Sequence, residues 1–169
     1  LNYNLGDFLK KFNKKAKYSC DISWLEKCEE WNINYPNVLE NWRKQKKLTN
    51  PYFFIEILSE ELNNKDIIIA DDGAHLTWAV QAFKIKKGQR FFSAFGNSPM
   101  GYALPASIGA SLVKNKKRVI CIDGDGSLQI NLQELHTLVV NKLPVKIFIL
   151  NNNGYGIIKQ FQELYLSKR

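Results

Sequence analysis

Apolar and polar positions follow a regular order from Asn50 to the end of the chain. Three runs are almost entirely apolar, as is typical of strands covered on both faces of a sheet: IIIA at 67–70, RVICI at 118–122 and KIFIL at 146–150. Around them, apolar residues recur at helical spacing, which predicts helices at 51–62, 75–83, 101–113, 131–140 and 155–166. This alternation predicts an α/β fold, a parallel sheet with helices on both faces.

Two of these helices carry start signals. Asn50 is placed to cap the first helix, and Pro51 occupies its first position. Asn131, followed three residues later by Glu134, forms a capping-box pattern. We therefore expect Asn131 to cap the helix that follows the second apolar run.

The first 50 residues have a different character. A short helix is expected within DISWLEKCEEW, capped by Asp21 or Ser23, and Pro36 ends that region. The stretch that follows has the composition of an exposed connector. We interpret residues 1–50 as a linker or the edge of a preceding domain and 51–169 as the domain proper. Because the chain begins with Leu1, we expect it to be a truncated part of a longer protein.

Composition narrows the class of protein. The net charge is +8, but the lysines are scattered along the chain, a pattern more typical of solvated surfaces than of a nucleic-acid-binding site. A positively charged surface would still attract anionic ligands. The sequence contains no apolar run long enough to span a membrane and no signal-peptide pattern. The chain has an odd number of cysteines, Cys20, Cys28 and Cys121, and no CxxC motif. This favours a reduced, cytoplasmic setting.

Each apolar run is followed by a polar turn: DDGAH, GDGS and NNNG. In a parallel sheet these turns lie at one edge, where α/β proteins bind ligands. Asp125 and Asn152 offer hard oxygen atoms, which suit Mg²⁺. Gly124, Gly126 and Ser127 allow close backbone approach and add a hydroxyl. Either turn alone is also a common turn sequence, but together they predict a site for a metal-bound diphosphate.

The two later turns also have a characteristic spacing, with residues 127–150 between Gly126 and Asn151. GDG, a spacer long enough for a helical crossover, and NN resemble the thiamine-diphosphate-binding motif. The blocks MGYALPASIGAS and DDGAHLTWAVQAF add to this resemblance. From about Trp24 to Arg169 the sequence resembles the C-terminal, diphosphate-binding part of acetolactate synthase and its relatives.

The resemblance implies roles for individual residues. The side chains of Asp125 and Asn152 and the backbone oxygen of Gly154 would bind Mg²⁺. Thiamine diphosphate would be lined by two turns and a helix start, at Gly73, Ala74, His75, Gly124, Gly126, Ser127 and Ile157. Acetolactate synthases usually have glutamine at the position of Ala74, so only backbone contact can remain there.

Two further positions would act at the reactive end of the cofactor. Met100 occupies the place of the family's large apolar wedge, which brings the aminopyrimidine toward the thiazolium C2, and the Ser98 carbonyl would hold the 4′-amino group. Packing alone is the alternative explanation for Met100. Packing equally explains Phe161, at a position where many acetolactate synthases have tryptophan. His136 is interpreted as a structural residue.

The implied function is decarboxylation of a 2-keto acid, with protonation or carboligation to follow. The segment FGNSPMG departs from the glycine-rich stretch usual in acetolactate synthases, so another keto-acid or activated-sugar substrate is an alternative. Two further alternatives are the separately encoded diphosphate-binding subunit of a keto-acid decarboxylase and a non-catalytic binding module of the same fold. The resemblance also implies a pyrimidine-binding domain on a partner subunit, within a homodimer or tetramer. That domain supplies the activating glutamate, so we expect the isolated chain to be inactive.

Overall fold

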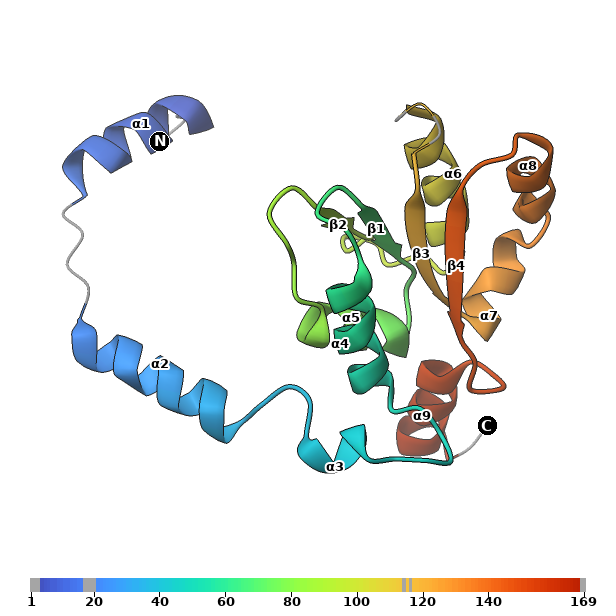
Figure 1. Ribbon diagram of the computed structural model, residues 1–169, viewed down its shortest axis with the longest axis horizontal. Coiled ribbons are helices and arrows are strands. Elements are labelled where there is room, and N and C mark those ends of the chain that lie inside the picture. The colour runs from blue at the N-terminus through green and yellow to red at the C-terminus, as the bar shows by residue number, and fades with distance from the viewer. Residues whose placement is uncertain (1–3, 17–20, 114, 116, 168–169) are drawn as a thin grey trace. The chain divides into compact units, whose positions relative to one another are not determined.

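The computed structural model describes residues 4–16, 21–113, 115 and 117–167 (Figure 1). The chain divides into two compact units, Leu1–Pro36 and Asn37–Arg169. Of the three cysteines, Cys20 lies outside the described residues. No helix in the described ranges is both long and apolar enough to cross a bilayer.

Two helices lie in the described residues of the first unit. Helix α1, Leu5–Lys15, is capped by the side chain of Asn4 and was not predicted from the sequence. Helix α2, Ile22–Asn34, begins where Asp21 accepts a hydrogen bond from Ser23 N at 3.0 Å. Asp21, and not Ser23, is therefore the cap of this predicted helix.

The second unit is built on a parallel sheet, which confirms the predicted fold class. Its strand order is β2-β1-β3-β4, with β1 at Ile67–Ala70, β2 at Arg90–Phe92, β3 at Val119–Gly124 and β4 at Val145–Leu150. Strand β2 was not predicted, because three residues at the edge of a sheet are too few to show a periodic pattern.

Helices cover both faces of the central strands (Figure 1). Alternate strand residues divide between the faces, as the two-residue repeat of a strand requires. Ile68 and Ile122 pack in the cluster that includes α4, Pro51–Glu61, and α5, Ala74–Ala82. Ile69 and Cys121 pack in the cluster that includes α6, Ala103–Val113. The remaining helices of this unit are α3 at Glu40–Arg43, α7 at Asp125–Leu128, the 3₁₀ helix η1 at Gln129–Asn131, α8 at Glu134–Val140 and α9 at Gly156–Tyr165.

Two sequence-based expectations are wrong. Strand β4 lies at an edge of the sheet and is only partly covered, with Ile149 48% exposed, whereas full burial was predicted. Asn131 does not cap a helix, because α8 begins at Glu134 without a side-chain capping bond. Instead, the Asn131 amide donates to the backbone oxygen of Gly101 at 2.7 Å.

The second unit begins at Asn37, whereas the sequence placed the start of the domain at residue 51. Val38 is buried in the α4–α5 cluster at 7% exposure. Trp42 stacks on Tyr52 with ring centroids 5.2 Å apart. Arg43 pairs with the buried carboxylate of Glu56 at 2.5 Å. These contacts attach residues 37–43 to the body of the unit.

A substitution tests this attachment. Val38→Ala is expected to lower the free energy of unfolding by about 1–2 kcal/mol, because it removes two methyl groups from a packed cluster. The neighbouring Leu39 is 38% exposed, so Leu39→Ala should cost less. Urea denaturation of the chain measures both. Equal small losses would mean that 37–43 is a connector only.

Candidate functional site

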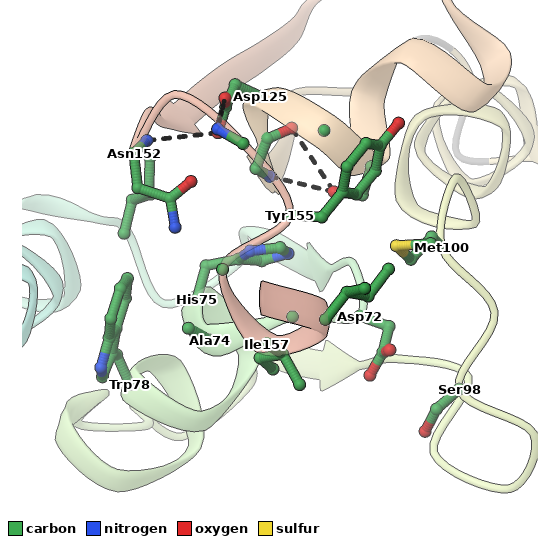
Figure 2. A pocket seen from close by; sticks show the side chains of 18 residues that line it. Asp72, Ala74, His75, Trp78, Ser98, Met100, Asp125, Asn152, Tyr155 and Ile157 are labelled. Atoms are coloured by element: carbon green, nitrogen blue, oxygen red, sulfur yellow. Dashed lines mark hydrogen bonds between the residues drawn. The ribbon is translucent and has the colours of Figure 1, made fainter. Parts of the chain in front are cut away.

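All the sequence-predicted site residues line one cavity of about 230 Å³ (Figure 2). The cavity lies where β1, β3 and β4 end, and it also receives the segment that precedes α6. It is lined by Gly73, Ala74, His75, Ser98, Met100, Gly124, Asp125, Gly126, Ser127, Asn152, Gly154 and Ile157. The expected convergence of the polar turns at one sheet edge is therefore observed, because parallel neighbouring strands end on the same side.

Asp125 connects two of these turns. Its carboxylate oxygens accept hydrogen bonds from the backbone N–H groups of Asn152 at 3.2 Å and of Gly154 at 2.8 Å (Figure 2). The turn after β3 therefore holds the loop after β4 in place. Gly154, at φ +156°, adopts a conformation that favours glycine.

Three oxygen atoms meet at this junction. The side-chain oxygen of Asn152 lies 3.2 Å from Asp125 Oδ1 and 2.6 Å from Gly154 O. With the amide reversed, its nitrogen would donate to both of these oxygens. A bound cation would favour the orientation with the amide oxygen inward, in which a carboxylate, an amide and a carbonyl oxygen face one another. Neighbouring oxygens around an octahedral Mg²⁺ lie about 3 Å apart, so this donor set fits a small hard cation.

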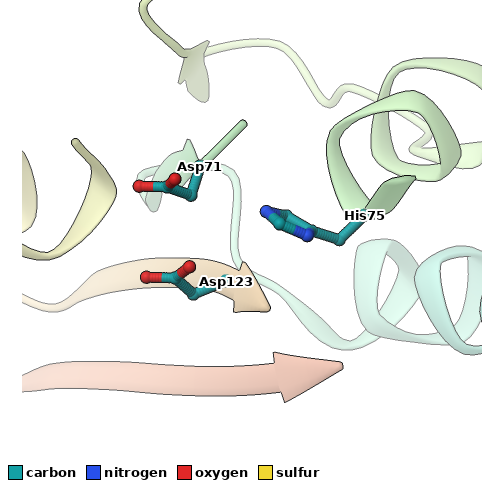
Figure 3. A group of neighbouring side chains, drawn as sticks. All are labelled: Asp71, His75 and Asp123. Atoms are coloured by element: carbon teal, nitrogen blue, oxygen red, sulfur yellow. The ribbon is translucent and has the colours of Figure 1, made fainter. Parts of the chain in front are cut away.

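Asp71, His75 and Asp123 form a buried polar cluster (Figure 3), and His75 also lines the cavity. Asp71, His75 and Asp123 present ligand atoms within 4.8 Å of one another. His75 Nε2 and Asp123 Oδ2 have no hydrogen-bond partner among the described residues. The Asp71 carboxylate, in contrast, accepts from the backbone N–H groups of Gly101 and Ala103.

Burial sets the charge of this cluster. It lowers the pKa of His75 to about 4 and raises the pKa of Asp123 to about 7. Burial also raises the pKa of Asp71, against the effect of the backbone N–H groups that it accepts from. At neutral pH His75 is uncharged and Asp123 is partly protonated. The cluster therefore repels an anion in the cavity less than two ionised carboxylates would.

The turn at the start of α7 is held by the same cluster. Asp123 Oδ1 accepts from Gly124 N at 2.8 Å and from the Ser127 hydroxyl. The His75 ring lies against the backbone here, since a Cβ on Gly124 would come within 3.1 Å of its Cε1. His75 is thus both a cavity-lining residue and a packing support for the GDGS turn.

Sequence reasoning missed several lining residues: Asp72, Trp78, Leu150, Tyr155, Gly156 and Ile158. Tyr155 packs its ring on Gly126, where a Cβ would lie 2.8 Å from Tyr155 Cδ1. Trp78 is one helical turn from His75 on α5, and this i, i+3 spacing could have identified it.

Two residues considered from the sequence lie outside the cavity lining. His136 is exposed on α8. Phe161 on α9 is 54% exposed and packs against Tyr165 with ring centroids 4.9 Å apart.

Comparisons with known proteins agree with this site. The family described as thiamine pyrophosphate enzyme, C-terminal TPP binding domain, matches residues 71–169; thiamine pyrophosphate is another name for thiamine diphosphate. The chain is 37% identical over 147 residues to the acetolactate synthase large subunit of Cyanidium caldarium, covering 87% of the chain and 24% of that protein. It is 35% identical over 154 residues to acetolactate synthase 1, chloroplastic, of Nicotiana tabacum, covering 90% and 23%.

A third relative, acetolactate synthase, chloroplastic, of Arabidopsis thaliana, is 41% identical over 115 residues, covering 68% of the chain and 17% of that protein. The chain spans about a quarter or less of the length of these curated relatives. The matched family region contains the turns that converge on the cavity, from Asp71 through Asn152. The chain therefore belongs to the thiamine pyrophosphate enzymes and contains their C-terminal cofactor-binding domain.

Proposed function

We propose that this chain is the diphosphate- and Mg²⁺-binding half of an enzyme that decarboxylates a 2-keto acid and joins the product to a second carbonyl compound, as an acetolactate synthase does. The observation that carries the proposal is the oxygen set of Asp125, Asn152 and Gly154 at the edge of the cavity that Met100 also lines. The relatives' names support the reaction class.

The residues present fit a metal-bound diphosphate. Asp125, Asn152 and the Gly154 carbonyl would hold Mg²⁺, which leaves coordination positions for phosphate oxygens and water. Gly126 and Ser127 would approach the phosphates with their backbone, and Ser127 is kept in place by its bond to Asp123. Burial raises the pKa of Asp123, and the lower negative charge behind the GDGS turn reduces repulsion of the anion.

Met100 and Ser98 would act at the other end of the cofactor. Met100 would support the bent conformation in which the aminopyrimidine reaches the thiazolium ring, and the Ser98 carbonyl would accept from the 4′-amino group. When bound, thiamine diphosphate supplies a nucleophilic carbon and an electron sink for loss of carbon dioxide. The protein contributes the position of the reacting groups.

A second domain would complete the site. We propose the pyrimidine-binding domain of a partner subunit, in a homodimer or tetramer. Helix α9, next to the cavity, has no buried residue, and its apolar side chains Ile157, Ile158 and Phe161 are between 44% and 54% exposed. An apolar surface of this kind is typical of a protein–protein contact. The partner domain would also supply the glutamate that activates the aminopyrimidine.

A related enzyme with another keto-acid or activated-sugar substrate is a second candidate. It is favoured by the segment FGNSPMG, which departs from the glycine-rich stretch usual in acetolactate synthases and contributes Ser98 and Met100 to the cavity lining. Product analysis of the full-length enzyme with pyruvate alone, and with pyruvate plus other acceptors, separates the two candidates.

Calorimetric titration of the full-length protein with thiamine diphosphate tests the proposal. We expect binding in Mg²⁺ that is lost in EDTA, accompanied by release of carbon dioxide from a 2-keto acid. Metal-dependent binding without turnover of any keto acid would mean that the protein is a non-catalytic binding module and not an enzyme.

The isolated 169-residue chain should not turn over. With saturating thiamine diphosphate, Mg²⁺ and pyruvate, we expect carbon dioxide release and C2 proton exchange no faster than with free cofactor, since the activating glutamate is supplied in trans. The full-length protein assayed in parallel is the control. Exchange in the isolated chain well above the free cofactor would mean that the activating group lies within these residues.

A further inference from the structure

Gly101, the residue directly after Met100, is held by two side chains from different parts of the chain. Asp71, which follows β1, accepts from Gly101 N at 2.9 Å and from Ala103 N at 2.5 Å. Asn131, at the end of η1, donates from its amide to Gly101 O at 2.7 Å. Both polar groups of the Gly101 backbone are thereby engaged by side chains 30 residues away in sequence.

Packing reinforces this attachment. Gly101 is buried and has φ +84°, in the region that favours glycine. A Cβ at this position would lie 2.7 Å from Ile130 Cβ and 3.0 Å from Asn131 Nδ2. The Gly101 backbone therefore lies directly against η1.

The chain on the other side of Met100 has no comparable support. Residues 95–99 are all exposed. Ser98 bonds through its N–H to Ala94 O at 2.8 Å and through its hydroxyl to Phe95 O at 3.3 Å, both within the same segment. The side-chain hydrogen bonds that hold the chain next to Met100 are therefore those to the backbone of Gly101.

Asn131 is also connected through the chain to the turn at the diphosphate end of the cavity. Helix η1 directly continues α7, which carries Asp125, Gly126 and Ser127. We propose that Asn131 is a positioning residue: its amide ties Gly101, and through it Met100, to the turn that lines the diphosphate. This inference rests on the proposed function, because it gives Met100 the task of shaping the bound cofactor. A reacting geometry of this kind tolerates only small displacements.

Asn131 is the informative position for a test. Asp71 is fully buried, and its removal would take the acceptor from the backbone N–H groups of Asp72, Gly101 and Ala103 and endanger the fold. Asn131 is only partly buried. Asn131→Asp keeps the shape and the oxygen that accepts from Gln133 Nε2 at 3.2 Å, while an acceptor replaces the donor facing Gly101 O.

In the full-length enzyme, Asn131→Asp is expected to lower kcat and C2 proton exchange about tenfold or more, since small misplacements of reacting groups cost rate steeply. The concentration of thiamine diphosphate that gives half saturation, measured in Mg²⁺, should change less than about threefold, because the oxygen set that binds the metal is untouched.

Asn141→Asp is a matched control. The Asn141 amide also donates to a backbone carbonyl, that of Thr137, at 2.8 Å, but at the end of α8 and outside the cavity lining. This variant should keep both parameters at the parent values. C2 exchange in Asn131→Asp within twofold of the control, or a loss of cofactor affinity as large as the loss of exchange, would overturn the inference.

A double-mutant cycle tests whether Asn131 acts through Met100. In a Met100→Ala background, Asn131→Asp should change C2 exchange less than about twofold, because the residue that it positions is already gone. Full additivity of the two losses would overturn the inference while leaving the proposed function intact. A parent enzyme that binds no thiamine diphosphate would overturn the proposed function, and the inference with it.

Discussion

Asp125→Ala is expected to weaken Mg²⁺-dependent binding of thiamine diphosphate to the full-length enzyme by more than about a hundredfold, since loss of even a hydrogen-bond partner of a metal ligand typically costs ten- to a hundredfold. Two effects combine. The variant removes the only carboxylate of the oxygen set that also contains Asn152 and Gly154. It also removes the acceptor for the backbone N–H groups of Asn152 and Gly154, so the other two oxygens lose their support.

The measurement is a calorimetric titration at fixed Mg²⁺, repeated in EDTA. Glu61→Ala is the control, because Glu61 is an exposed carboxylate at the end of α4 outside the cavity lining. It makes the same change in net charge without touching the oxygen set. Circular dichroism checks that Asp125→Ala is folded. A folded variant that binds the cofactor with parent affinity would rule out Asp125 as a metal ligand.

Met100→Ala is expected to lower C2 proton exchange and kcat by about a hundredfold, the scale of loss for a misplacement of about 1 Å at a reacting centre. The affinity for thiamine diphosphate should fall much less, because Met100 and the oxygen set lie on different segments of the cavity lining. A change in kcat without a matching change in cofactor affinity identifies an interaction with the reacting geometry.

Met100→Leu separates shape from packing. Leucine has a similar volume, so this variant should cost little stability and retain much more of the exchange rate than Met100→Ala. Thermal unfolding of both variants reports any general loss of packing. If Met100→Ala exchanges the C2 proton at the parent rate, Met100 is a packing residue.

The local pattern of the sequence determined strands β1, β3 and β4, the main helices around them and the place of the site. Buried parallel strands need nearly continuous apolar runs, and each run here is followed at once by a polar turn. Because parallel strands end on the same side, the sequence predicted that Asp125 and Asn152 lie close together. In the structure the Asn152 N–H donates a hydrogen bond to the Asp125 carboxylate. The predictions for Ser98 and Met100 came from the family resemblance alone, and both residues line the cavity.

Only the tertiary structure decided the position of β4 at the sheet edge and the role of Asn131. The apolar run of β4 looks like that of β3, and no local feature says which of the two has a neighbour on each side. Asn131 and Glu134 match a capping box, yet the amide bonds to Gly101, 30 residues away. Likewise, Asp71, His75 and Asp123 become one buried cluster only when β1, α5 and β3 pack together. Contacts of this kind depend on which elements become neighbours in space, and burial then sets hydrogen-bond partners and pKa values that residue type and spacing do not contain.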